Sequence, residues 1–202
     1  THWMFADELQ RRFPRVQVVP DRLVVDEGDV ITAGGVLAWA DLGLSIVHRL
    51  LGRAVTNSTA RFIMMDPPGR EPRYYGEFAP RMQHGDLPIL AVQRWLHADL
   101  RATATVRSLA DRASLTSRTF LRRFVRATGI KPSVYRQRVR IQRGKDLLEQ
   151  SNQSVEGIAF AIGYEDAGAF RRSFRRVVGL TPMEDRHRFQ RTDQRAPGGR
   201  AG

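Results

Sequence analysis

A fourteen-residue pattern that occurs twice constrains the fold of this 202-residue chain more than any other feature. Residues 119–132 read TFLRRFVRATGIKP, and residues 169–182, fifty positions later, read AFRRSFRRVVGLTP. In a helix of 3.6 residues per turn, the phenylalanines of each copy share one face and arginines occupy the opposite face. A glycine then ends each helix, and a proline opens the next one. Each copy therefore predicts an amphipathic helix, a stop and a restart.

A second short helix is predicted upstream of each copy, in residues 106–114 (VRSLADRAS) and residues 155–163 (VEGIAFAIG). Both segments carry small apolar residues at a spacing that lets another helix cross closely, and a turn of three or four residues follows each. This order is typical of a helix-turn-helix motif, whose downstream helix is the recognition helix. Thr116 or Ser117 is expected to cap the first recognition helix, and Asp166 the second.

Residues 132–150 (PSVYRQRVRIQRGKDLLEQ) are predicted to form one long helix between the two motifs. Nineteen residues at about 1.5 Å each span roughly 28 Å. One turn of duplex DNA, which separates successive major-groove faces, is about 34 Å long. The pattern therefore predicts two recognition helices held in consecutive major grooves by a rigid connection.

The net charge of +12 lies in the second half of the chain. Residues 1–86 carry 10 basic and 11 acidic side chains, residues 87–191 carry 21 and 9, and residues 192–202 carry 2 and 1. A basic domain beside a neutral one is typical of nucleic-acid binders, because basic side chains that neutralise phosphates release counterions. A basic surface that serves only solubility is the alternative.

Several classes of function are not expected. The chain has no cysteine, and its five histidines are scattered without ligand spacing, so we predict no metal and no cofactor. No apolar run reaches the roughly 18 residues needed to span a bilayer, and no export signal is present, which predicts a cytoplasmic protein without a membrane partner. Because the sequence begins with Thr1 rather than methionine, we expect it to be the C-terminal part of a longer protein.

Residues 87–190 resemble the DNA-binding domain of the AraC family of bacterial transcription regulators, an all-α domain with two helix-turn-helix units joined by a long helix. The resemblance rests on SLADRASLTSRTFLRRFVRATGIKPSVY, on Arg140 and Leu147-Leu148, and on IAFAIGYEDAGAFRRSFRRVVGLTP. Two positions depart from the family pattern. Gly144 replaces a usual alanine, which is expected to cost roughly 0.5–1 kcal/mol of helix stability. Asp185 replaces an aromatic residue, so we expect the last helix to pack less firmly.

The resemblance implies that base contacts come from the outer faces of the two recognition helices, and helical periodicity selects the same side. Arginine can donate two hydrogen bonds to guanine, and leucine can contact the thymine methyl group. The predicted base-reading residues are Arg118, Leu121, Arg122, Gly168, Arg171 and Arg172. Since Gly168 reaches little, the second half-site is expected to be read more loosely. The predicted phosphate contacts are Ser117, Arg123, Arg126, Lys131, Arg175 and Arg176.

The first half of the chain predicts an α/β fragment. VQVVP, LVVD and DVITAGG, between residues 16 and 35, alternate like strands, and helices are expected in residues 36–51, ended by Gly52, and in residues 54–65. THW, DRLVVDEGDVITAGGV and ADLGLSIV resemble the C-terminal part of a PfpI-like domain, related to class I glutamine amidotransferases, in residues 1–65. That resemblance matches His2 to a histidine that activates a cysteine nucleophile, but we predict no catalytic residue. Residues 66–86 are expected to be a linker, and residues 191–202 a disordered tail.

The leading hypothesis is a sequence-specific regulator of transcription, controlled through its first domain, that binds double-stranded DNA. RNA polymerase, a small-molecule effector and a second copy of the chain are further candidate partners. One alternative is a PfpI-like hydrolase or amidase with a basic appendage. A second alternative is nonspecific binding of nucleic acid, with RNA disfavoured because no aromatic stacking surface is evident.

Overall fold

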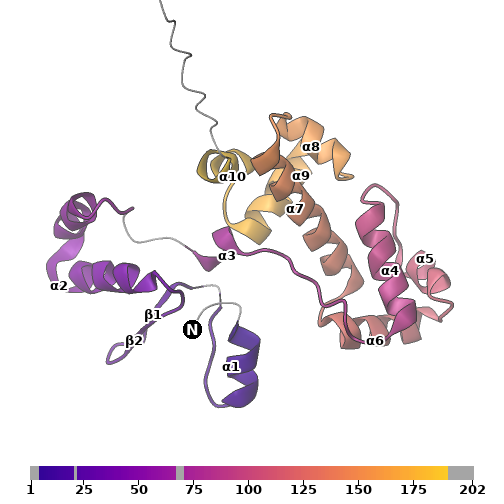
Figure 1. Cartoon of the computed structure of the whole chain (residues 1–202), viewed down its shortest axis with the longest axis horizontal. Helices are drawn as coiled ribbons and strands as arrows, with labels where there is room; N and C mark the ends of the chain where they lie inside the picture. The colour runs from indigo at the N-terminus through magenta and orange to yellow at the C-terminus, as the bar shows by residue number, and fades with distance from the viewer. Residues whose placement is uncertain (1–4, 21, 67–70, 191–202) are drawn as a thin grey trace, which may run out of the picture. The chain divides into compact units, whose positions relative to one another are not determined.

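The computed structural model describes residues 5–20, 22–66 and 71–190, and the chain divides into two compact units, residues 1–76 and 77–202 (Figure 1). His2, part of the predicted linker and the predicted tail lie outside the described residues. Among the described residues, no helix is both long enough and apolar enough to cross a bilayer.

The first unit combines helices with a small two-stranded sheet. Its elements are α1 (Ala6–Arg12), β1 (Val24–Asp26), β2 (Ile31–Ala33), α2 (Ala38–Phe62) and α3 (Pro72–Tyr75). β1 and β2 pair antiparallel, with Val25 opposite Thr32. Gly28 adopts the left-handed φ of 92° in the connecting turn, where its N–H donates to Asp26 Oδ1 at 2.9 Å. The strands predicted in LVVD and DVITAGG are thus confirmed, although both are shorter than the sequence pattern.

The strand predicted in VQVVP, residues 16–20, is wrong. No strand lies there, and the N–H of Val18 donates to Gln10 Oε1 at 3.3 Å instead of to a neighbouring strand. An alternating pattern alone cannot supply the partner strand that a ladder requires. The helix break predicted at Gly52 is confirmed, because this residue interrupts α2 with φ 77° and ψ 178°.

The second unit is built from helices in its described part. They are α4 (Leu87–Ala98), α5 (Val106–Arg112), α6 (Ser117–Thr128), α7 (Pro132–Gln150), α8 (Val155–Ala161), α9 (Ala167–Val178) and α10 (Pro182–Phe189). Helices α4, α5 and α6 gather at one end of α7, and α8, α9 and α10 gather at the other end (Figure 1). α7 therefore connects two small helical groups, as the repeat predicts.

Each helical group has its own apolar core, to which α7 contributes. Phe120 and Phe124 of α6 are fully buried in the first core, where Phe124 packs edge-on against Tyr135 of α7 with ring centroids 5.3 Å apart. Phe170 and Phe174 of α9 are fully buried in the second core. The repeated phenylalanines are therefore core residues, and their burial excludes base stacking.

Gly144 of α7 lies at a close approach between helices. A Cβ atom at this position would lie 3.1 Å from Phe170 Cε2 and 3.2 Å from Ile162 Cδ1. These distances are shorter than an ordinary carbon contact. The glycine that departs from the family pattern therefore allows α7 to lie close to the second core.

The second unit begins inside residues 66–86, the segment predicted as a linker. Residues 77–86 belong to the second unit. The N–H of Phe78 donates to Gln142 Oε1 at 2.8 Å, and its ring packs edge-on against Tyr135 at 5.3 Å. Gln93, which is fully buried, donates to the carbonyl oxygen of Arg81 at 3.1 Å. The proline and glycine of residues 77–86 therefore indicate irregular backbone that packs on the second unit, not a solvent-exposed linker.

Candidate nucleic-acid interface

The two recognition helices, α6 and α9, begin and end in the same way. Thr116 caps α6 by accepting from the N–H of Thr119 at 3.3 Å, which settles the alternative with Ser117. Asp166 caps α9 by accepting from the N–H groups of Gly168 at 2.9 Å and Ala169 at 2.7 Å. These hydrogen bonds hold the pKa of the Asp166 carboxyl below its usual value. Gly129 and Gly179 end the helices in the left-handed conformation, as predicted.

The turn of each motif also repeats. Ser114 follows α5 with φ 53°, and Gly163 follows α8 at the equivalent position with φ 86°. Both upstream helices have a side-chain cap, from Thr105 in the first motif and Ser154 in the second. Caps and core positions therefore coincide in the two motifs, although the second turn is one residue longer, and each recognition helix presents the same side of its surface outward.

That outer side is basic and exposed. Of the twelve predicted DNA contacts, Arg123 and Gly168 are half-buried and the other ten are exposed. The exposed ones are Ser117, Arg118, Leu121, Arg122, Arg126, Lys131, Arg171, Arg172, Arg175 and Arg176. Guanidinium groups in such positions can donate two hydrogen bonds to a guanine edge or to a phosphate.

Arg123 does not belong to this outer surface. Its Nε and Nη2 atoms donate to Asp86 Oδ2 and Oδ1 at 2.9 and 2.8 Å, and the two side chains are only 30% and 10% exposed. Asp86 also caps α4 by accepting from the N–H of Ile89 at 3.2 Å. The hydrogen bond from Arg123 holds the pKa of the Asp86 carboxyl below its usual value. Arg123 therefore ties α6 to the start of α4.

The two recognition helices differ in how their arginines are paired. In α9, Arg171 forms an ion pair with Glu156 of α8, and Arg172 lies 3.7 Å from the carboxylate of Asp166. In the described part of the chain, no ion pair involves Arg118 or Arg122 of α6. The guanidinium groups of Arg118 and Arg122 are therefore available to a ligand without breaking an ion pair of the described residues.

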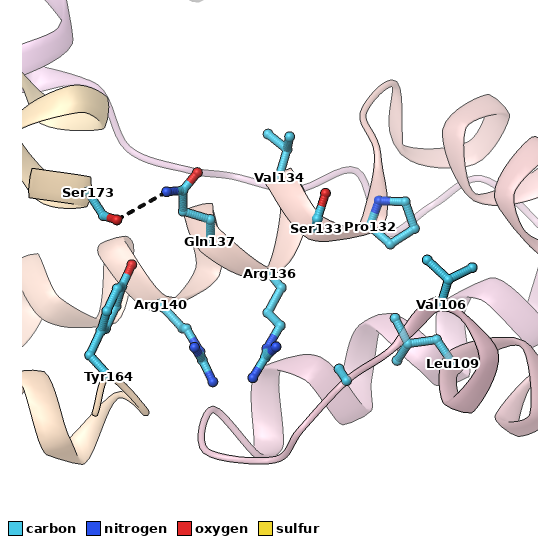
Figure 2. Close-up of a pocket in the computed structure, with 11 residues that line it drawn as sticks. Val106, Leu109, Pro132, Ser133, Val134, Arg136, Gln137, Arg140, Tyr164 and Ser173 are labelled. Atoms are coloured by element: carbon cyan, nitrogen blue, oxygen red, sulfur yellow. Dashed lines mark hydrogen bonds between the residues drawn. The ribbon is translucent and has the colours of Figure 1, made fainter. Parts of the chain in front are cut away.

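A cavity of about 370 Å³ lies along α7 between the two motifs (Figure 2). Arg136 and Arg140 project from α7 in the same direction into it, and Gln137 donates to Ser173 Oγ of α9 at 3.3 Å. Arg136 Nη2 donates to the carbonyl oxygen of Ala102 at 2.6 Å, and Arg140 Nε donates to that of Leu100 at 2.8 Å.

These hydrogen bonds fasten the loop between α4 and α5 to α7. Burial, together with the neighbouring charge of Arg136, lowers the pKa of Arg140 from its usual value. The two arginines therefore help to fix the first motif on α7, and Gln137 does the same for the second. The sequence indicated Arg140 only through the family resemblance and contained no signal for Arg136 or Gln137.

The comparisons with known proteins agree with this geometry. Residues 109–188 match a family model described as a helix-turn-helix domain. The chain is 24% identical over 188 residues to the HTH-type transcriptional regulator ArgR of Pseudomonas aeruginosa, covering 92% of this chain and 56% of ArgR. It is 36% identical over 92 residues to the HTH-type transcriptional activator RhaS of Escherichia fergusonii, covering 46% of this chain and 33% of RhaS.

The chain thus spans between a third and three fifths of the length of these two relatives. Among solved structures, the C-terminal domain of AraT, a response regulator from Geobacillus stearothermophilus, is similar with a TM-score of 0.51 and 17% identity. The similarity covers 53% of this chain and 89% of the AraT domain. It supports the same fold for the second unit.

Proposed function

We propose that this chain, whose second unit contains an AraC-family helix-turn-helix domain, is a regulator of transcription that binds double-stranded DNA sequence-specifically. The observation that carries the proposal is the pair of equivalently capped helices, α6 and α9, at opposite ends of α7 with their basic faces exposed.

The dimensions of α7 support binding to two successive grooves. Its 19 residues correspond to roughly 28 Å, close to the ~34 Å of one duplex turn. The cavity residues Arg136, Gln137 and Arg140 connect both motifs to α7 by hydrogen bonds. A connection of this kind fixes the spacing of two half-sites in advance, which lowers the ordering cost of binding both.

In this proposal the two helices contribute differently. Arg118 and Arg122 read guanine edges in the first half-site, and Leu121 contacts a thymine methyl group. Arg171 and Arg172 read the second half-site, where Gly168 allows close approach without a contact of its own. The remaining exposed residues position the domain on phosphates, and they are Ser117, Arg126, Lys131, Arg175 and Arg176. Arg123 is left out because Asp86 holds it.

The experiment is selection of duplexes by the full chain from a random library, followed by affinity measurements on the selected and a scrambled duplex. Arg122→Ala is expected to cost about 1–3 kcal/mol on the selected duplex and far less on the scrambled one. Arg94→Ala, at an exposed arginine of α4 outside both motifs, is the matched control and should treat both duplexes alike. A library that yields no preferred sequence would contradict specific binding.

We further propose that residues 1–65 are part of a PfpI-like regulatory domain. The hairpin followed by a long broken helix is compatible with such a fragment, and the 188-residue match to ArgR extends over the first unit. In this proposal a small-molecule effector or a second copy of the chain acts on the first unit, and RNA polymerase is contacted on the DNA. Loss of the first unit should then change the response to effectors but leave the selected sequence unchanged, which repeating the selection with residues 77–190 would check.

A further inference from the structure

The two helix-turn-helix motifs are opposite in charge at one pair of equivalent positions. Matching the first residues of α5 and α8, Val106 and Val155, places Arg107 of α5 opposite Glu156 of α8. Matching Phe120 of α6 with Phe170 of α9 places Leu121 opposite Arg171. The second motif therefore has an acidic residue in its upstream helix where the first has a basic one, and an arginine at a reading position where the first has a leucine.

These two differences meet in space. Arg171 Nη2 forms its ion pair with Glu156 Oε1, and both side chains are 52% exposed. The pair is therefore at the surface, beside Arg172 and its neighbour Asp166. Of the two residues at the equivalent positions in the first motif, Leu121 has no charge, so no ion pair can form with Arg107.

We propose that Glu156 is a positioning residue that sets the base specificity of the second recognition helix through Arg171. This inference rests on the proposed function. Glu156 does not itself contact a base. It holds the Arg171 guanidinium at the reading surface and makes its transfer to a phosphate unfavourable.

The donor geometry of arginine allows both contacts at once. A guanidinium has five N–H donors in a planar fork, of which a guanine edge uses two. The carboxylate of Glu156 can accept hydrogen bonds from some of these N–H groups while others face the base. If Arg171 instead turned to a phosphate, Glu156 would lose its partner and lie near a second negative charge. Guanine is therefore favoured over a phosphate, which carries no sequence information.

The first motif has the opposite arrangement. Arg107 lies at the start of α5 and is exposed, so it adds positive charge to a helix end that faces the duplex in helix-turn-helix complexes. The two motifs therefore contribute in different ways. Arg107 adds affinity to the first motif, and Glu156 lets the second motif discriminate despite the small residues at the start of α9.

The test compares Glu156→Gln with Glu165→Gln in the full chain. Glu165 is an exposed acidic residue in the turn of the same motif, so its replacement removes the same charge without touching the ion pair. The probes are a duplex that the wild-type chain selects from a random library, every single base-pair variant of its second half-site, and a scrambled duplex. The base pair that Arg171 reads is the one at which Arg171→Gln loses preference for the selected base pair. Discrimination is the affinity for the selected duplex divided by the affinity for the duplex that is changed at this base pair.

Both glutamine variants are expected to bind the scrambled duplex more tightly, since each removes one negative charge near phosphates. Glu156→Gln should in addition lower discrimination at that base pair by about threefold, in keeping with a surface ion pair of up to ~1 kcal/mol. Glu165→Gln should leave discrimination unchanged. In an Arg171→Gln background, Glu156→Gln should have no further effect on discrimination, because the residue acts through Arg171.

Two results would overturn the inference alone: equal discrimination in the two glutamine variants, or an undiminished effect of Glu156→Gln when Arg171 is already replaced. Failure of the wild-type chain to select any sequence would overturn the proposed function and this inference together.

Discussion

At the scale of single residues, Arg123 shows that a basic residue on a recognition helix can serve the fold. Its bidentate contact with Asp86 joins α6 to the cap of α4. Arg123→Ala is therefore expected to lower the free energy of unfolding of the second unit by about 1–3 kcal/mol. It should leave unchanged the slope of log affinity against log salt concentration. By contrast, each lost phosphate contact reduces the magnitude of that negative slope by about 0.9.

Urea unfolding and salt titrations of DNA binding measure both quantities. Arg126→Ala is the matched variant, because Arg126 is exposed on the same helix. It should lower the salt slope and leave stability nearly unchanged. An Arg123→Ala variant with unchanged stability and a reduced salt slope would instead support the phosphate contact that the sequence predicted for Arg123.

Asp185 of α10 introduces a pH dependence. It is fully buried against α7, and neither carboxylate oxygen has a hydrogen-bond partner in the described structure. Burial raises the pKa of Asp185 from 3.8 to about 6, with Lys145 favouring the charged form and Glu149 opposing it. Because the folded state holds this proton more tightly than the unfolded state, the contribution of Asp185 to stability is fully present below a pH of 3.8 and is lost as the pH rises through about 6.

Asp185→Asn removes this titration. At pH 7 the variant is expected to be more stable than the wild type by about 1–2 kcal/mol, and the difference should vanish below pH 4. Urea unfolding followed by amide NMR signals of α7 and α10 at each pH provides the measurement. Asp111→Asn, at an exposed position of α5, is the matched control for the loss of one carboxylate. A difference in free energy of unfolding between the wild type and Asp185→Asn that stays constant from pH 4 to 7 would contradict the expectation.

At the scale of elements, the turn of the second motif depends on a glycine that the first motif replaces. A Cβ atom on Gly163 would lie 2.5 Å from the carbonyl oxygen of Leu100 and 2.6 Å from Arg140 Nη2, and φ is 86°. Gly163→Ala is therefore expected to destabilise the second unit by about 3 kcal/mol or more. Ser114→Gly, the matched change in the first motif, should alter stability by less than about 1 kcal/mol.

Thermal or urea unfolding of the two variants would check this difference. The steric argument involves the loop that Arg140 fastens to α7, so Gly163→Ala should also perturb the amide signals of residues 99–104. Equal stability of the two variants would show that this loop moves to accommodate the added Cβ atom without lowering the free energy of unfolding.

The elements near the repeat were predictable because their signals are local. Caps such as Thr116 and Asp166, the ends at Gly129 and Gly179, and the buried phenylalanines all follow from spacing within one helix or its flanks. The Arg123–Asp86 contact joins residues 37 positions apart, and no local pattern distinguishes it from an exposed arginine. The charge reversal at Glu156 was visible in the alignment of the two copies, but its contact with Arg171 required the structure.

In the first unit the strand predicted in VQVVP failed for the same reason. Alternation indicates a strand only if a partner strand is available, and residues 24–26 and 31–33 pair with one another instead. The break at Gly52 was predictable, since glycine interrupts a helical pattern through its own backbone.

At the scale of the whole molecule, the folding unit that binds DNA is expected to begin at Glu77 rather than at Leu87. Residues 77–86 supply Phe78 to the first core, hydrogen-bond partners to buried Gln93, and Asp86 to both the α4 cap and Arg123. A fragment of residues 87–190 loses all of these contacts. We therefore expect it to be less stable than residues 77–190 by about 3 kcal/mol or more, from the lost aromatic burial and hydrogen bonds.

Urea unfolding of the two fragments tests this boundary, with Phe78→Ala in residues 77–190 as the control for the aromatic contact alone. The longer fragment should bind the selected duplex with the affinity and salt slope of the full chain, because the exposed residues of α6 and α9 are all present. The shorter fragment should bind more weakly in proportion to its unfolded fraction, and stabilising it with an excess of the selected duplex should restore its folding. If the two fragments had the same free energy of unfolding, residues 77–86 would act as a linker. The contacts of Phe78 and Arg81 would then contribute nothing measurable to the stability of the second unit.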